Sequence, residues 1–530
     1  MTPQLTIYQR RILIGMVFCV AAFLAVGVKL VMVMGFAPTA APSRHAPPMV
    51  FSRADLLDRN GEIIARDLPA GDLYARPALL KDKTRAAQGL AAALDVDGEH
   101  VATLLKNKSP SVLIARQVSL TDQAKIAALK LPGLEYLRNS KRFYADGRTS
   151  AQVIGVTDLD GKGVSGLERG VEAKLRDGSG PVTTSIDKRV QFILAAETAS
   201  SMAEFRAHAA GGLILDVQTG EVLAMVSLPD FDPNVRQFTA TDSGRNIMVQ
   251  DVYELGSVFK IFAFALGIED HKIQLSENLP IGNGLKIGRF TIHEAEHMPA
   301  YLAARDVLAQ SSNIGTAQIA LRSGGERQRA FLGNLGLLSP LRSELPERAR
   351  PLFPEHWGTI ETATIGFGHG ISVSPLSFAA AAASVVNGGR RVAPTFLKHP
   401  DDARGEQVVS AQTSATMRSL LRYVVTNGTG KKADVPGYDV GGKTGSAEKP
   451  GRHGYQAGKL VTSFCAAFPI ENPRYLVFVV LDEPHGTKAT AGFALAGYTA
   501  APLVAHVVAR IAPLLRVQIN PLTANKKEST

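Results

Sequence analysis

The spacing of hydrophobic positions changes along the chain, and the first pattern is a long apolar run. Ile12 to Met34 is broken only by Lys29 and is long enough to cross a bilayer as a helix. The Arg10-Arg11 pair precedes it, which by the positive-inside rule places the N-terminus in the cytoplasm. A cleaved signal peptide is the alternative, because Ala-rich sequence follows, but the run is longer than a signal h-region. We expect a cytoplasmic N-terminus at 1–11, a retained transmembrane anchor at 12–34 and an extracytoplasmic remainder.

The next region predicts a small mixed domain. A Pro- and Ala-rich stretch at 35–52 predicts an extended linker. Beyond it, Asn60-Gly61 lies between apolar flanks and predicts a tight hairpin turn. Helical patterns mixed with short strand patterns follow at 84–95, 97–106 and 121–130. Because 53–184 carries no chemical motif, we interpret it as a non-catalytic α+β pedestal.

The longer region 185–515 predicts a second α+β domain. Ser185 is the expected cap of a helix from Asp187 to Glu204. Two strand pairs are predicted, 212–217 with 221–228 near the start of the region and 460–469 with 475–484 near its end. A helix at 499–515 closes the region. Strands from both ends around a helix-rich middle predict one central antiparallel sheet flanked by helices. Residues 516–530 are expected to form a flexible tail.

Composition narrows the classes of function. A length of 530 residues is too great for one compact core and predicts more than one domain. The formal net charge is +10, but no Lys/Arg stripe with interleaved aromatic residues occurs, so nucleic acid is not an expected partner. A basic chain suits work beside anionic lipid or an anionic wall. The two cysteines, Cys19 and Cys465, lie far apart and predict no disulfide framework.

The first chemical pattern is Ser257-Val-Phe-Lys260, followed at once by an apolar helical run. If a helix starts near Gly256, Ser257 and Lys260 share one face and reach each other. A serine hydroxyl becomes a good nucleophile when a base takes its proton, and a neutral lysine amine is such a base. The pattern recurs at Ser185/Lys188 and Ser446/Lys449, where the preceding Gly and the apolar run are missing.

Two further patterns follow in the chain. Ser311-Ser-Asn313 stands before a helical run, and its simplest interpretation is a helix cap. Lys443-Thr444-Gly445-Ser446 lies in a Gly-rich extended segment, where backbone and ligand can approach closely. A lysine with flanking hydroxyls there suits a substrate carboxylate, whereas a Gly-rich hairpin with a surface lysine is the alternative. The three patterns in this order are typical of penicillin-binding proteins and class A β-lactamases.

The chain resembles the class B penicillin-binding proteins, the monofunctional peptidoglycan D,D-transpeptidases, from Arg53 to about Pro502. It is most similar to their septal, cell-division branch. Leu255 stands where Pro is common and Ser446 where Thr is common. The segments that carry the resemblance, besides the three patterns, are Leu57–Gly61, Gly166–Glu168, Leu215–Met225, Tyr253–Lys260, Gly368–Leu376, Val425–Gly430 and Asp482–Pro484.

The resemblance implies a role for each matching residue. Ser257 would attack the penultimate D-Ala carbonyl of a stem peptide and form an acyl-enzyme, with Lys260 as the proton acceptor. Ser311 would relay a proton to the departing D-Ala, while Asn313 and Lys443 hold that network. Thr444 and Ser446, on either side of Gly445, would bind the terminal carboxylate. No metal or cofactor is implied. The partners implied are peptidoglycan stem peptides, β-lactam antibiotics, a polytopic glycosyltransferase and other division proteins.

The two motif lysines should differ in charge. Lys260 faces inward beside apolar residues, so desolvation and the nearby Lys443 should lower its pKa. Lys443 lies in a Gly-rich segment that we expect to be more open, so it should stay charged.

Other classes of protein share part of this pattern. A class A β-lactamase hydrolyses its acyl-enzyme with a glutamate and a water, and no Glu-x-x-Leu-Asn lies between Asn313 and Lys443. A penicillin-binding sensor would carry a cytoplasmic domain, and a bifunctional synthase would need a glycosyltransferase domain before residue 200. A non-catalytic wall scaffold would not need three intact motifs. The elongation-specific class B enzymes remain an alternative to the septal branch.

Overall fold

The computed structural model describes residues 7–36, 53–235, 244–399, 405–451 and 454–524. The predicted linker at 35–52 lies almost wholly outside these residues. The chain separates into two units, Met1–Phe51 and Ser52–Thr530. The first contains one helix, α1 (Ile7–Phe36). Within the residues that the structure describes, no helix is both long and apolar enough to cross a membrane.

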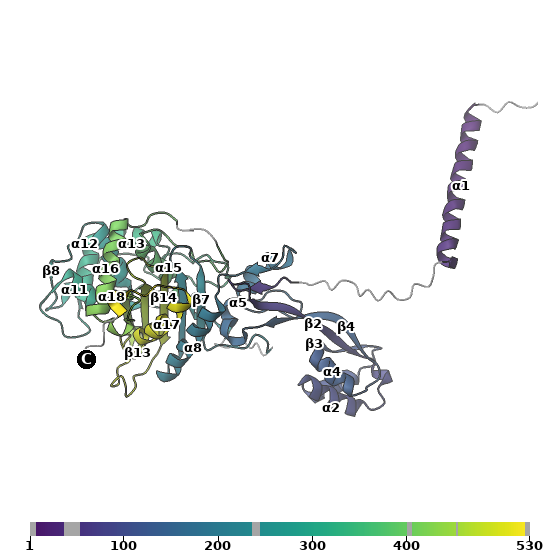
Figure 1. Ribbon diagram of the computed structural model, residues 1–530, viewed down its shortest axis with the longest axis horizontal. Coiled ribbons are helices and arrows are strands. Elements are labelled where there is room, and N and C mark those ends of the chain that lie inside the picture. Colours follow the sequence, from purple (N-terminus) through teal and green to yellow (C-terminus); the bar gives the residue numbers. More distant parts are fainter. Residues whose placement is uncertain (1–6, 37–52, 236–243, 400–404, 452–453, 525–530) are drawn as a thin grey trace, which may run out of the picture. The chain divides into compact units, whose positions relative to one another are not determined.

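The pedestal is a five-stranded sheet with helices at one end (Figure 1). The long strand β2 (Ile63–Ala75) pairs with β4 along its length and with β3 and β1 on its other side, and β1 pairs in parallel with β5. The Asp58 carboxylate accepts the N–H groups of Asn60 and Glu62, and Gly61 has φ +91°, which confirms the predicted turn. The remaining elements are β1 (Leu56–Leu57), β3 (Val112–Ser119), β4 (Leu134–Tyr144), β5 (Val182–Thr183), α2 (Lys83–Leu94), α3 (Gly98–Leu105), α4 (Leu120–Ala128), α5 (Ala151–Ile154), α6 (Gly166–Gly170) and α7 (Glu172–Arg176).

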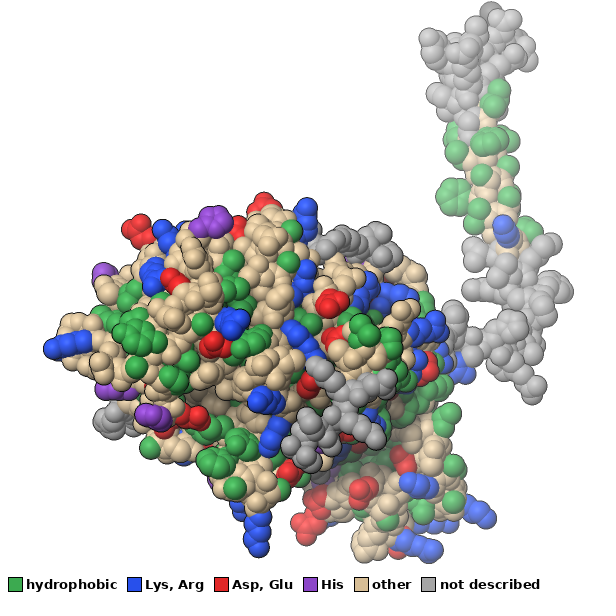
Figure 2. Space-filling view, turned by 60° about the vertical axis from the view of Figure 1, so that its left-hand side comes forward, with side chains coloured by type: hydrophobic (Ala, Val, Ile, Leu, Met, Phe, Trp, Pro, Cys, Tyr) green, Lys and Arg blue, Asp and Glu red, His purple; other side chains and the backbone are tan. Residues whose placement is uncertain are grey.

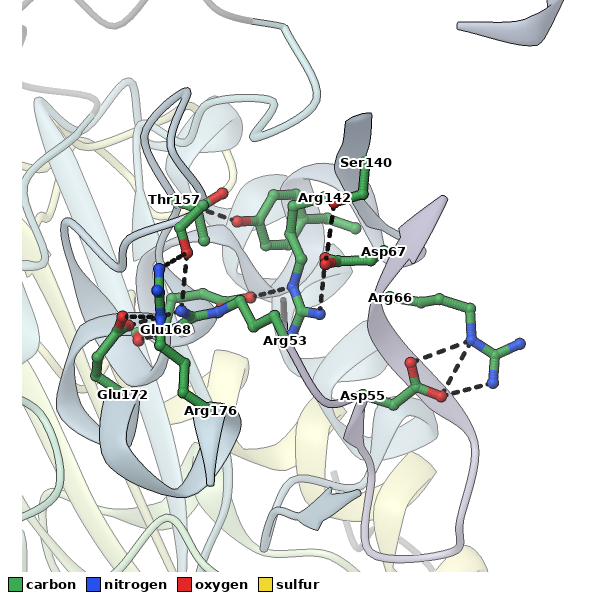
Figure 3. A network of polar contacts seen from close by, with 12 residues as sticks. Arg53, Asp55, Arg66, Asp67, Ser140, Arg142, Thr157, Glu168, Glu172 and Arg176 are labelled. Atoms are coloured by element: carbon green, nitrogen blue, oxygen red, sulfur yellow. Dashed lines mark hydrogen bonds and ion pairs between the residues drawn. The ribbon is translucent and has the colours of Figure 1, made fainter. Parts of the chain in front are cut away.

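The base of the pedestal holds a buried ion-pair cluster (Figure 3). Glu168, with no exposed surface, accepts from Arg53 at 2.5 Å and from Arg142 at 2.7 Å. Arg142 also contacts Asp67 at 3.2 Å, and Arg53 contacts Glu172 at 2.7 Å. Buried charges persist only when they are paired, so these contacts fix the first described residues of the unit onto the pedestal strands.

The second region is built on an antiparallel sheet in the order β12-β13-β14-β6-β7 (Figure 1). In β14 the side chains of Leu476, Phe478 and Val480 belong to one core, and those of Val477 and Val479 to another. This alternation places a helical layer on each face of the sheet. The first core also includes residues of the pedestal base, such as Leu56, whereas α2–α4 enclose a small core of their own.

The strands and helices of this region match the predicted pattern and extend it. The sheet consists of β6 (Ala209–Asp216), β7 (Val222–Leu228), β12 (Gly441–Gly451), β13 (Gly454–Phe468) and β14 (Tyr475–Asp482). The short strands are β8 (Asn278–Pro280), β9 (Leu285–Ile287), β10 (Phe290–Ile292) and β11 (Tyr301–Ala303). The helices are α8 (Lys188–Glu204), α9 (Ile247–Gln250), α10 (Lys260–Glu269), α11 (Ala304–Ala309), α12 (Asn313–Ser323), α13 (Gly325–Asn334), α14 (Thr359–Gly366), α15 (Pro375–Val386), α16 (Ala411–Asn427), α17 (Ala500–Leu514) and α18 (Pro521–Ala524).

Two local expectations need correction. Asp187, not Ser185, caps α8, because its carboxylate accepts the N–H of Arg189, whereas the buried Ser185 hydroxyl donates to the carbonyl of Val222 at 2.6 Å. The stretch expected to be a flexible tail contains α18. The side chain of Asn520 donates to Asp439 at 2.7 Å, which holds that part of the chain to the domain. The last residues, 525–530, lie outside the described part.

Candidate active site

The first motif forms a tight turn that leads into a buried helix. Gly256–Phe259 is a 3-10 turn continued by α10. Side chains three apart eclipse each other in a 3-10 turn, so Ser257 and Lys260 lie on the same side. Gly256 needs its left-handed φ of +59°, and a Cβ there would meet the Ser446 carbonyl oxygen at 3.0 Å. The turn therefore presents a partly exposed Ser257 beside β12, with the fully buried Lys260 beneath it.

Lys260 binds the second motif. Its Nζ donates to the Ser311 carbonyl at 2.5 Å and to Asn313 Oδ1 at 2.8 Å, and it lies 3.1 Å from Ser311 Oγ. Among the described residues, no hydrogen bond joins Ser257 Oγ to Lys260. Catalytic hydrogen bonds are often long before substrate binds, so this separation is compatible with a role as base.

Ser311 adopts a conformation that its own side chain disfavours. Its φ is +65°, a region that costs a residue other than glycine about 1 kcal/mol or more. The neighbouring residues hold it there, since Ser312 caps α12 through the N–H of Gly315 at 2.9 Å and Lys260 binds the Ser311 carbonyl. The result is a hydroxyl placed between two amines, because Lys443 Nζ also donates to Ser311 Oγ at 2.9 Å.

The third motif lies on the edge strand β12. Lys443 donates to the carbonyl of Thr444 at 3.1 Å and to its hydroxyl at 3.2 Å, and Thr444 Oγ1 is 2.7 Å from Thr429 Oγ1. Ser446 Oγ accepts the N–H of Ala496 at 2.9 Å. The expectation that Lys443 is open is wrong, because its side chain is fully buried. The small glycines that allow close approach here also let the strand pack tightly over the amine.

Close backbone packing fixes the Gly256–Phe259 turn, which carries Ser257, against β12. A Cβ on Gly445 would lie 2.5 Å from the Leu255 carbonyl oxygen and 2.6 Å from Ser463 Oγ. A Cβ on Gly368 would lie 2.1 Å from the Gly256 carbonyl oxygen. These glycines are therefore required for the strand, the turn and the loop after α14 to meet at the site.

Both lysines have lowered pKa values. Burial, and then the charge of Lys443, holds the pKa of Lys260 well below its usual 10.5, against the opposing charge of Glu294. Burial lowers the pKa of Lys443 to about 7. Lys260 is therefore suited to be a neutral base at physiological pH, as predicted, while Lys443 exchanges its proton near neutrality rather than staying firmly charged.

Several residues that complete the site could not be recognised from their sequence context. The Glu294 carboxylate receives hydrogen bonds from three consecutive residues at the start of α12. His369 is half-buried, and its partial removal from water and then the charge of Lys260 lower its pKa to about 4. Tyr455 donates to Glu254 at 2.8 Å and its ring lies 5.2 Å from that of His369. Long-range pairs of this kind leave no local signal. In the part of the chain that the structure describes, no cluster of three or more metal-ligating side chains occurs.

Comparisons with known proteins assign the family. Residues 210–505 match the penicillin-binding protein transpeptidase domain, and residues 48–202 match the penicillin-binding protein dimerisation domain. The probable peptidoglycan D,D-transpeptidase FtsI of Caulobacter vibrioides is 39% identical over 88% of this chain and 82% of its own length. The peptidoglycan D,D-transpeptidase FtsI of Escherichia coli is 28% identical over 90% of this chain and 86% of its own.

A solved structure agrees in fold and extent. Penicillin-binding protein 3 of Mycobacterium tuberculosis, complexed with aztreonam, matches with a TM-score of 0.69 and 26% identity, covering 89% of this chain and 98% of that one. These matches favour neither the β-lactamase nor the sensor alternative. The chain belongs to the class B penicillin-binding proteins of the FtsI type, the serine peptidoglycan D,D-transpeptidases.

Proposed function

We propose that Ser257 is the acylated nucleophile of a peptidoglycan D,D-transpeptidase that cross-links stem peptides during septum synthesis. The observation that carries this proposal is the convergence of three distant motifs. Ser311 Oγ lies 3.1 Å from Lys260 Nζ and 2.9 Å from Lys443 Nζ, and Asn313 binds Lys260 directly. A nucleophile, a base and a second proton carrier thus meet beside an open strand edge.

The residues divide the chemistry as follows. Neutral Lys260 takes the proton of Ser257, whose Oγ bonds to the penultimate D-Ala carbonyl carbon. Backbone N–H groups of Ser257 and Ser446 stabilise the oxyanion. The peptide C–N bond then breaks, and the terminal D-Ala amine leaves with a proton relayed through Ser311 from an amine of the site. The amine of a second stem then bonds to the acyl carbon and loses its extra proton to the same network, the ester bond to Ser257 Oγ breaks, and Ser257 Oγ regains a proton from that network.

Residues of β12 bind the terminal carboxylate of the stem peptide in this proposal. The Thr444 hydroxyl, with Thr429 behind it, and the Ser446 hydroxyl flank Gly445 on the open edge. Lys443 in its protonated form supplies the charge that a terminal carboxylate requires. A β-lactam ring carries the same carboxylate and a strained amide, so penicillins should enter by the same contacts.

Covalent trapping tests the assignment. Full-length protein incubated with a labelled penicillin should be acylated at Ser257, and Ser257→Ala should abolish labelling. Mass spectrometry of a proteolytic digest places the adduct. Ser185 and Ser446, which share the Ser-x-x-Lys spacing, serve as internal controls, and an adduct on either of them would overturn the proposal.

We also infer a single N-terminal membrane anchor with the catalytic domain outside the cytoplasm. Two observations support it. The apolar run 12–34 follows two arginines. The described part of α1 exposes apolar side chains around the helix, including Phe18 and Phe23, and Figure 2 shows hydrophobic side chains along it. A helix that is apolar on all sides suits lipid rather than water. N-terminal sequencing of the mature protein should show 12–34 retained, whereas a mature form beginning near residue 43 would indicate a cleaved signal.

The septal role and its partner rest on likeness to FtsI proteins. The partner expected is a polytopic glycosyltransferase that polymerises glycan strands, contacted in part through the anchor. Depletion should give filamentous cells, and a fluorescent fusion should gather at midcell. Cells that become spheres while still dividing would instead assign the protein to elongation.

A further inference from the structure

Glu294 is bound to the second motif although it belongs to none of the three. It lies just after β10, and its carboxylate accepts from the Ser312 hydroxyl at 2.5 Å and from the backbone N–H groups of Asn313 at 2.8 Å and Ile314 at 3.0 Å. These N–H groups belong to the first turn of an eleven-residue helix, where backbone donors lack helical partners. One side chain therefore fixes three successive residues of the turn.

The turn that Glu294 holds is the one that presents polar groups to Lys260. Ser311 precedes it in a left-handed conformation, and Asn313 is its first helical residue. A shift of this turn would move Ser311 Oγ and Asn313 Oδ1 away from the Lys260 amine together. We propose that Glu294 is a positioning residue for acylation, whose carboxylate fixes the position of this turn and whose negative charge acts on the buried Lys260 amine.

The charge argument follows from what surrounds Lys260. Among the described residues, the ionisable groups that act on it are Lys443 from β12 and Glu294, and the neutral ring of His369 lies near it from the loop after α14. The positive end of α12 also points at this region, and a carboxylate at a helix N-terminus neutralises it. Glu294 is the group that opposes the loss of the Lys260 proton. Without it, Lys260 would lose its proton at lower pH.

The inference rests on the proposed roles of Ser257 and Lys260, and its test separates the two. The rate of penicillin acylation of the full-length chain is measured against pH for wild type, Glu294→Gln, Glu294→Asp and Ser312→Ala. Glu294→Gln removes the charge and turns an amide N–H toward one backbone donor. Ser312→Ala loosens the same turn and keeps the charge. Mass spectrometry in each case reports whether the adduct is on Ser257, which is the separate test of the proposed function.

We expect Glu294→Gln to lower the maximal rate by about tenfold to a hundredfold. The acid limb of the acylation rate against pH should move to lower pH by at least about half a unit in this variant, because protonated Lys260 loses a nearby negative charge that stabilises it. The alkaline limb should stay, because burial sets the pKa of Lys443. Ser312→Ala and Glu294→Asp should lower the rate without moving the acid limb. An unmoved limb in Glu294→Gln, an equal movement in Ser312→Ala, or a wild-type rate in Glu294→Asp would each overturn the inference.

Discussion

Replacing Lys443 by methionine should make the protein more stable and unable to acylate. Lys443 is fully buried on β12, which lies between β13 and the Gly256–Phe259 turn, and burial lowers its pKa to about 7. Methionine fills a similar volume without a charge. The two hydroxyls that Lys443 binds keep other partners, since Ser311 Oγ retains Lys260 and Thr444 Oγ1 retains Thr429. The substitution therefore removes a buried cation without leaving either hydroxyl unpaired.

The magnitude follows from the difference in pKa between the folded and unfolded states. The usual value is 10.5 and the folded value is about 7. At about 1.4 kcal/mol for each unit, this difference corresponds to roughly 5 kcal/mol. The folded pKa is the lower one, so the penalty is complete below about pH 7 and disappears as the pH rises toward 10.5. Loss of the lysine hydrogen bonds destabilises the methionine variant by about 1–3 kcal/mol at every pH.

Lys443→Met should therefore exceed wild type in free energy of unfolding by about 2–4 kcal/mol at pH 6, and by about zero at pH 9. Denaturant unfolding of the transpeptidase transition, followed at several pH values, measures this difference. Penicillin labelling on the same samples reports the lost acylation. A stability difference that stays constant from pH 6 to pH 9 would show that the lysine does not titrate in this range and would refute the argument.

Three other substitutions test the site and its support. Lys260→Arg should lose acylation almost completely, because a guanidinium does not give up its proton. Lys443→Arg keeps the charge and should keep measurable labelling by fluorescent penicillin. Near-normal labelling of Lys260→Arg would show that Lys260 is not the base. Glu168→Ala should lower the free energy of unfolding, measured with denaturant, by about 3–5 kcal/mol, because it leaves buried arginines without their partner. Arg66→Ala, in the exposed pair with Asp55, should lower it by less than about 1 kcal/mol. Equal losses in the two variants would contradict the argument. Gly445→Ala should reduce acylation at least about tenfold, because its Cβ would displace the Gly256–Phe259 turn, while the secondary structure seen by circular dichroism persists. Normal penicillin labelling of this variant would show that the turn adapts.

Much of the fold could be predicted because its signals are local. Short continuous apolar runs, with a turn between 217 and 221, predicted β6, β7 and β14, which are buried on both faces, and the closing helix α17 was predicted from a long apolar run. The cap of α8 was assigned wrongly for a physical reason. Ser185 and Asp187 are both good capping residues two apart, and only the backbone path decides between them. That path carries Ser185 into a hydrogen bond with Val222, a residue far along the chain.

The chemistry of the site could be predicted in its residues but not in its environment. The order of motifs pointed to Ser257, Lys260 and Lys443, and their roles came from family likeness. The burial of Lys443 could not be predicted, because it depends on how β12 packs against α16 and the Gly256–Phe259 turn. Glu294 also gave no signal, since nothing in its neighbourhood shows that its carboxylate meets a helix that begins almost twenty residues later.

Two buried amines on either side of one hydroxyl share protons as a unit. Ser311 Oγ lies within hydrogen-bond distance of both amines, at 2.9 Å from Lys443 Nζ and 3.1 Å from Lys260 Nζ. Because each amine lowers the affinity of the other for a proton, the pair holds one proton far more readily than two. In the proposed mechanism the pair would become doubly charged when Lys260 takes the Ser257 proton, and passage of a proton through Ser311 to the leaving amine would relieve this repulsion. In the proposed mechanism Ser311 would thereby couple acylation to the departure of D-Ala, and its φ of +65° is part of the local geometry that holds the hydroxyl between the two amines.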